Sequence, residues 1–121
     1  MRRDETLRLL RATPAILWAA GIWWLSSNPS PPGSSWLEIP HLDKVAHFGL
    51  FFVQAILLRV AGMSARMAFL VAITWGGIDE VHQRFVPGRA ADHGDWLADV
   101  VGATIGALGS KESWMKSLGR G

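Results

Sequence analysis

One stretch of the chain, Val45 to Leu58, constrains the fold most strongly. Only His47 and Gln54 interrupt it with polar side chains. A helix with so few polar positions has no wide face for water, so it must be covered by other helices or by lipid. The stretch therefore predicts either the interior of a helical bundle or a membrane-spanning segment.

Four apolar segments of this kind follow one another, separated by breaks rich in proline, glycine and serine. We expect helices over Thr13 to Leu25, Asp43 to Ala61, Ser64 to Gln83 and Asp95 to Gly109. Thr13-Pro14 and Ser64 are typical helix starts, and Gly62 is a typical helix end. The second and third helices, about 19 residues each, would be roughly 28 Å long, close to a hydrocarbon core of about 30 Å.

The segments between and around these helices are predicted to be irregular. Residues Ser26 to Pro40 and Arg84 to Gly94 are expected to be loops, because proline and glycine cannot continue a helix there. The basic residues before Thr13 are expected to form a frayed start, and Ser110 to Gly121 a short amphipathic tail at a membrane interface.

Composition allows one domain and leaves a soluble alternative open. The chain has 121 residues, half of them apolar, with a mean hydropathy of only +0.21. The modest hydropathy favours a soluble bundle with an apolar core, whereas the unbroken second segment favours lipid. We interpret the chain as an all-α, four-helix transmembrane bundle with residues 1–12 as a basic cytoplasmic start, 13–109 as the membrane domain and 110–121 as a cytoplasmic or interfacial tail.

The basic residues predict the orientation of this bundle. With the start of the chain in the cytoplasm, nine of the twelve Lys and Arg residues lie on that side and three on the other. Such a bias follows the positive-inside rule, and it places both chain ends in the cytoplasm of a bacterial cytoplasmic membrane.

Several chemistries are not indicated by the sequence. The absence of cysteine excludes disulfides and thiolate sites, and a net charge of +2 without a basic stripe gives no nucleic-acid footprint. Metal-ligand residue types are present, but no spacing matches a zinc signature such as H-E-x-x-H, so no metal is assigned. Cofactor, substrate and oligomeric state are not indicated.

Under this topology, all four histidines and most carboxylates lie toward the outer side. Three pairs share a helical face at one-turn spacing: Asp43 with His47, Asp79 with Gln83, and Asp95 with Asp99. Charged groups cost about 2.5 to 3.5 kcal/mol at a bilayer centre, so they pair or line a wet cavity. We therefore expect these residues to gather into one polar cluster.

Each of these residues also has a purely structural interpretation. Asp43 could cap its helix, His47 could be a satisfied core histidine, and either Asp79 or Glu80 could be a charge at the membrane rim. Asp99, a full turn inside its helix, must pair with Arg89, Lys44 or His47, or take up a proton. An ion-pair network that only holds the bundle together is as well supported as a catalytic one.

The combination of three motifs resembles the VanZ-like family. The motifs run from Asp43 to Phe48, from Gly77 to Arg89 and from Asp95 to Gly106, and a Ser-Ser-x-Pro turn at Ser26 precedes them. The resemblance implies a small, multi-pass bacterial membrane protein of the cell envelope, whose founding member is associated with resistance to the glycopeptide antibiotic teicoplanin. It spans nearly the whole predicted membrane domain.

The resemblance also assigns motif positions to this chain. They are Asp43, Lys44, His47, Asp79, Glu80, Gln83, Arg89 and Asp95, with Gly102 and Gly106 as packing positions; the last two form a GxxxG motif that favours close helix approach. Asp99 is a departure, since the family often has Asn there, and it adds a negative charge to the cluster.

Three functions are compatible with these residues. In the first, Arg89 and Lys44 hold the anionic head group of a membrane lipid or a lipid-linked envelope precursor, while His47, Asp79 and Glu80 set the local charge. In the second, His47, Asp79 and Glu80 perform acid/base catalysis in a membrane-embedded hydrolase or transferase. In the third, the cluster is structural.

The predicted orientation is testable because the chain contains no cysteine. In sealed intact cells, a reagent that cannot cross membranes should label the variants Ser34→Cys and Ala91→Cys and should leave Ser64→Cys unlabelled until the cells are opened. Labelling of Ser64→Cys alone would contradict the orientation, and recovery of the protein in a detergent-free high-speed supernatant would contradict the membrane assignment itself.

Overall fold

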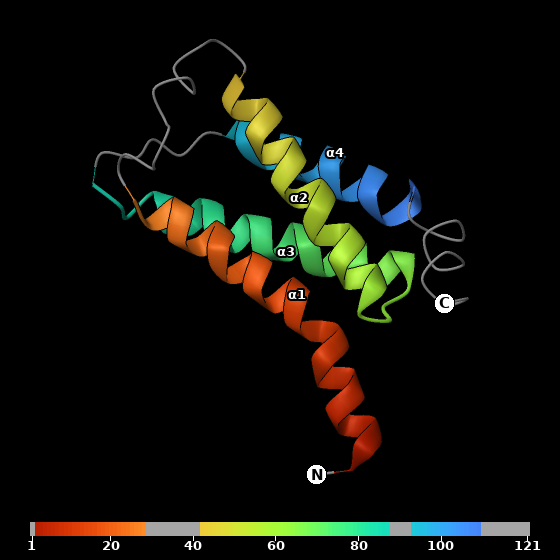
Figure 1. Ribbon diagram of the computed structural model, residues 1–121. Coiled ribbons are helices and arrows are strands. Elements are labelled where there is room, and N and C mark those ends of the chain that lie inside the picture. Colours follow the sequence, from red (N-terminus) through yellow and green to blue (C-terminus); the bar gives the residue numbers. More distant parts are fainter. Residues whose placement is uncertain (1, 29–41, 88–92, 110–121) are drawn as a thin grey trace.

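Helices account for nearly all of the chain that the computed structural model describes, which is residues 2–28, 42–87 and 93–109. These residues contain no strand and form four helices: α1 Arg3–Ser27, α2 Leu42–Val60, α3 Ala65–Gln83 and α4 His93–Gly109 (Figure 1). The predicted all-α, four-helix fold is confirmed.

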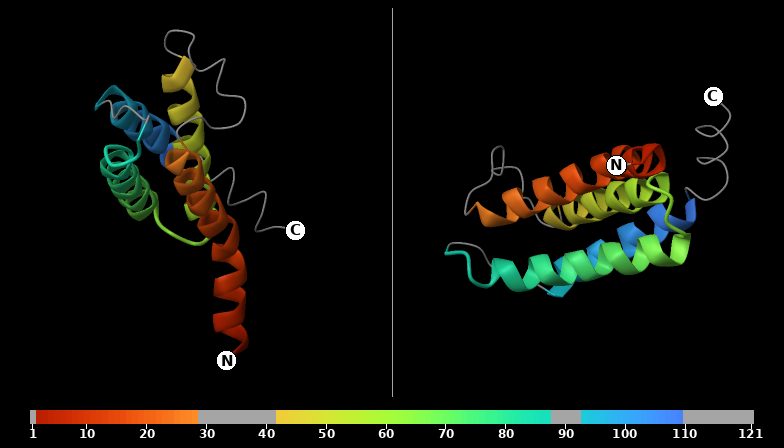
Figure 2. Two further views of the ribbon diagram at one scale, coloured as in Figure 1. Left: turned by 90° about the vertical axis from the view of Figure 1, so that its left-hand side faces the viewer. Right: turned by 90° about the horizontal axis from the view of Figure 1, so that it is seen from below.

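The helices are arranged so that α2 and α4 run in one direction and α1 and α3 in the other. As a result, the ends of α1 and α3 lie on the same side of the bundle as the starts of α2 and α4 (Figure 1). We call this side the polar end. The most extensive interface joins α2 to α4, and the first half of α1 projects away from the other helices (Figure 2).

The turn between α2 and α3 forms as the sequence predicts. Gly62 has a φ of 107°, a left-handed conformation that glycine adopts without steric cost. Ser64 is the N-cap of α3, and its hydroxyl accepts a hydrogen bond of 3.2 Å from the Met67 backbone N–H. Local chemistry is sufficient to specify this hairpin.

The predicted start of the first helix is wrong. Helix α1 begins at Arg3 and continues through Pro14, and the Thr13 hydroxyl donates to the Leu9 carbonyl, 2.7 Å away, as a residue inside a helix does. Pro14 has no N–H for the Leu10 carbonyl, which is tolerated at the cost of a bend. Figure 1 shows α1 changing direction in this region.

Two loop boundaries also differ from the prediction. Ser26 and Ser27 belong to the last turn of α1, although the sequence placed them in a loop, and α4 begins at His93 and includes Gly94. In both cases the polar residues at the boundary are compatible with a helix end. Arg89, the tail 110–121, and most of the two predicted loops, including Ser34 and Ala91, lie outside the described residues.

Glycines bring α2 and α4 into close contact. A Cβ atom on Gly102 would overlap the Phe48 carbonyl oxygen, and one on Gly106 would overlap the Phe52 carbonyl oxygen. The GxxxG prediction of close helix approach is therefore confirmed. Only the absence of a side chain at these two positions allows the backbones to approach this closely.

Small residues also dominate the core. Its fully buried members are mainly alanines, and the largest apolar one is Phe51, which has no exposed surface. Within the described ranges, no helix has both the length and the apolar character needed to cross a membrane. The transmembrane assignment therefore stays a prediction.

We expect Gly102→Ala to destabilise the protein by about 1 to 3 kcal/mol, because the added methyl group forces α2 and α4 apart. Thermal unfolding of the purified protein in mild detergent measures this. Gly49→Ala is the matched control: it lies in α2, where a Cβ atom meets nothing within 4 Å, so it should leave the unfolding temperature unchanged or raise it slightly. Equal unfolding temperatures for the two variants would contradict the proposed role of Gly102.

Candidate functional site

The polar end contains eight of the nine residues that the sequence singles out. They are Asp43, Lys44 and His47 on α2, Asp79, Glu80 and Gln83 on α3, and Asp95 and Asp99 on α4. The ninth, Arg89, lies outside the described residues. The side chains on α2 contact those on α4, and the side chains on α3 contact the end of α1.

A histidine and a carboxylate form a largely buried contact between α2 and α4. His47 Nδ1 lies 2.8 Å from Asp99 Oδ1, and the two side chains are 15% and 3% exposed. The other ring nitrogen, Nε2, is 3.6 Å from Asp95 Oδ2, which is too long for a hydrogen bond. Of the partners that the sequence allows for Asp99, the structure shows His47.

Lys44 connects two carboxylates at the rim of the same interface. Its Nζ lies 3.0 Å from Asp43 Oδ2 and 2.7 Å from Asp95 Oδ1. Asp43 is the second residue of α2, inside the helix, so the interpretation of Asp43 as the N-cap is wrong. The ammonium group is thus partly neutralised by two carboxylates from different helices.

The ends of α1 and α3 are joined by a second set of hydrogen bonds. The Ser26 hydroxyl donates to Asp79 Oδ2, and Gln83 Nε2 donates to Ser26 Oγ at 3.2 Å. All three side chains are buried, as is Glu80 in the same turn of α3. Sequence reasoning missed Ser26 because it treated this serine as part of a loop, although the Ser-Ser-x-Pro motif contained the signal.

An aromatic contact lies beside this set. The rings of Trp23 and His82 stack with centroids 3.8 Å apart and planes 16° apart, and His82 Nε2 lies 2.9 Å from Ser27 Oγ. The sequence assigns His82 only to the predicted outer side, together with the other three histidines. No spacing in the sequence predicts its contact with Trp23, since the two residues belong to different helices.

A glycine on α3 allows Asp99, the partner of His47, to lie close to the helix that carries Asp79. A Cβ atom on Gly76 would lie 3.0 Å from Asp99 Oδ2 and 3.3 Å from a ring carbon of Phe51. Asp99 is therefore enclosed by α2, α3 and its own helix. This position explains why Asp99 is among the largest fully buried side chains of the described residues.

Carboxylates outnumber cations at the polar end. Asp43, Asp79, Glu80, Asp95 and Asp99 lie there, whereas the Lys and Arg residues at this end of the described chain are Lys44 and Arg84, accompanied by His47 and His82. No group of three or more histidines and carboxylates within this part of the chain has a geometry that could hold a metal ion. The cluster is instead suited to accepting hydrogen bonds and to transferring protons through His47.

The fold and the site together define a class: a small four-helix protein with a buried, carboxylate-rich cluster at one end of the bundle. A family model described as VanZ/LLP1 matches residues 4–114. The chain therefore belongs to the VanZ/LLP1 family, which confirms the resemblance seen in the sequence. Neither a curated protein nor a solved structure matches the chain.

We expect His47 and Asp99 to be energetically coupled. A double-mutant cycle with His47→Ala and Asp99→Ala, measured by unfolding in detergent, should give a coupling energy of about 1 to 3 kcal/mol, because each single variant leaves a buried polar group without its partner. The partly exposed pair Asp43 and Lys44 is the control and should couple by less than about 1 kcal/mol. Equal coupling energies for the two pairs would show that burial does not strengthen the interaction of His47 with Asp99.

Proposed function

We propose that this protein is embedded in the bacterial cytoplasmic membrane as a multi-pass bundle, with its polar end at the outer side. Exposed apolar side chains support this proposal. Leu97, Val101, Ile105 and Leu108 follow one face of α4, and each is roughly half exposed or more. A continuous apolar stripe of this kind is costly in water and favourable against lipid tails.

The direction of the polar side chains supports the same proposal. Gln54, Asp79 and Asp99 are each at most 3% exposed, so they face other helices. These residues lower the apolar character of each helix when it is taken alone. The outer surface of the assembled bundle is more apolar than the individual helix sequences, and that surface is what would contact lipid.

The function that this geometry supports best is binding of a head group, from a membrane lipid or a lipid-linked envelope precursor, at the polar end. The observation that carries the proposal is the gathering of polar side chains at one end of a bundle with apolar sides. A molecule with a polar head and apolar tail would find a matching surface for both parts.

Charge refines which parts of the head group the cluster would contact. Lys44 already pairs with Asp43 and Asp95, so it is a weaker phosphate ligand than its charge alone would indicate. The excess of carboxylates instead favours head-group donors, namely hydroxyl and amine groups. Contact with a phosphate is assigned to Arg89, on the sequence motif alone.

A second candidate function is catalysis by a membrane-embedded hydrolase or transferase. The specific observation in its favour is the His47–Asp99 pair, in which a carboxylate orients an imidazole whose Nε2 makes no hydrogen bond to Asp95. This is the arrangement of a general base. Asp79 and Glu80 would then act on the leaving group from α3.

A link to teicoplanin-type glycopeptide resistance belongs to this proposal as well. Family membership supports it, because a protein that binds lipid-linked envelope precursors would alter how such a drug reaches them. The drug susceptibility of bacteria expressing the wild-type protein, compared with bacteria expressing Asp79→Asn at equal protein level, tests this link.

Lipids that copurify with the protein provide the main test. We expect mass spectrometry of protein purified in mild detergent to detect one retained lipid class. We expect Asp43→Asn, at a carboxylate that is 41% exposed, and Arg89→Gln each to reduce its amount about five-fold, the effect of losing one hydrogen bond of about 1 kcal/mol. Arg66→Gln, an exposed position at the opposite end of α3, should leave the amount of retained lipid unchanged.

The same measurement separates the three functions. Unchanged lipid retention in both polar-end variants would reject head-group binding. Conversion of the lipid to a product by the wild type, lost in His47→Gln, would establish catalysis. If the variants only unfold more easily and the folded fraction keeps its lipid, the cluster is structural.

A further inference from the structure

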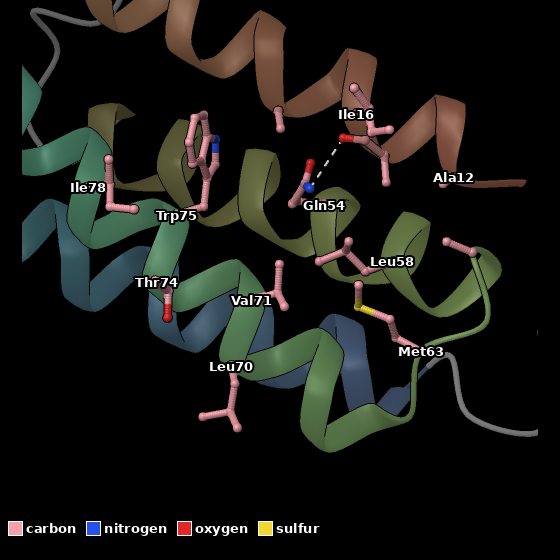
Figure 3. A pocket seen from close by; sticks show the side chains of 13 residues that line it. Ala12, Ile16, Gln54, Leu58, Met63, Leu70, Val71, Thr74, Trp75 and Ile78 are labelled. Carbon is pink, nitrogen blue, oxygen red and sulfur yellow. Dashed lines mark hydrogen bonds between the residues drawn. The ribbon is translucent and has the colours of Figure 1, made fainter. Parts of the chain in front are cut away.

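A groove lies along the middle of the bundle, between α1, α2 and α3 (Figure 3). Its volume is about 570 Å³, within the usual range of small-molecule sites. Most of its lining is apolar, including Ile16, Leu58, Met63 and Leu70. From Leu70 to Ile78 it follows α3 for roughly 12 Å, at 1.5 Å per residue.

A buried glutamine forms part of the wall of this groove. Gln54 is 3% exposed, and its Nε2 donates to the Ala15 carbonyl at 3.3 Å. Its Oε1 is also buried and has no hydrogen-bond partner among the described residues. Figure 3 shows the amide of Gln54 between α1 and α3, beside the groove. A buried acceptor in an apolar wall is therefore left without a hydrogen-bond partner in the described part of the chain.

A tryptophan on α3 contributes a second buried polar atom to the wall of the same groove, again without a hydrogen-bond partner among the described residues. Trp75 lines it, and its buried Nε1 has no hydrogen-bond partner within the part of the chain described. The indole nitrogens of Trp18 and Trp96, in contrast, donate to the carbonyls of Leu50 and Ile73 at 2.8 and 3.2 Å. Trp75 thus differs from these two part-buried indoles, each of which donates to a backbone carbonyl.

We propose that this groove binds a long-chain alcohol. A hydroxyl group within reach of both atoms can accept a hydrogen bond from Trp75 Nε1 and donate one to Gln54 Oε1, because an oxygen of this kind has both capacities. The alkyl chain then fills the apolar space beside Leu58 and Leu70. A plain alkane leaves both polar atoms without partners, and a water molecule leaves the apolar volume empty.

This site is separate from the polar end. None of the eight described polar-end residues lines the groove, whose polar side chains are those of Gln54, Thr74 and Trp75. Binding of an alcohol here does not require that the polar end bind a head group. Variants of His47 and Asp79 that keep the fold should leave it unchanged, so the two proposals can fail independently.

The test compares 1-decanol with n-decane, which has the same chain without the hydroxyl. Each is titrated into the purified full-length protein in detergent, and the rise in unfolding temperature is followed to saturation. The wild type should bind decanol more tightly than decane. In Gln54→Leu and in Trp75→Phe, the apparent affinity for decanol should fall about five-fold, the loss expected for one hydrogen bond, while that for decane should stay the same.

Two further variants serve as controls. Trp18→Phe removes an indole that does not line this groove and should leave the preference for decanol intact. Leu70→Ala should lower the apparent affinity for decanol and for decane by the same factor. If Gln54→Leu does not fold, Trp75→Phe decides the result. Equal effects of alcohol and alkane on the wild type would overturn the proposal, as would the absence of a saturable effect.

Discussion

The close contact between the backbones of α2 and α4 is the constraint on which the polar end depends. Gly102 and Gly106 lie against the carbonyl groups of Phe48 and Phe52, and this contact fixes the register of two parallel helices. Each helix is rigid and rises about 1.5 Å per residue. The same register therefore places His47 beside Asp99, which lies one turn before Gly102 on α4. A side chain at Gly102 would therefore disturb the charged pair as well as the packing.

The polar end has an unequal balance of charge, and the position of Asp99 shows how the bundle accommodates it. Its carboxylate is enclosed beside Gly76 and bonded to His47. Lys44 is shared between Asp43 and Asp95 in the same interface. Lys44 and His47 both belong to α2, so this helix supplies the basic partner in each of these pairs.

Much of the fold was predictable because its signals are local. Gly62 and Ser64 specify the α2–α3 turn through their own backbone and side-chain preferences. Gly102 lacks a side chain, which indicates a close helix contact. The start of α1 was not predictable in this way. Thr13 and Pro14 together favour a helix start, yet both are accommodated inside a helix that begins at Arg3.

The sequence by itself determined that the chain forms four helices, where most of them end, and that its carboxylates and histidines lie near helix ends, because periodicity, caps and glycines act over a few residues. Only the tertiary structure decided which of these groups meet. The pairs His47 with Asp99, Ser26 with Asp79 and Trp23 with His82 each join residues more than fifty positions apart. Partners so distant in sequence are set by helix register and packing, which no local pattern encodes.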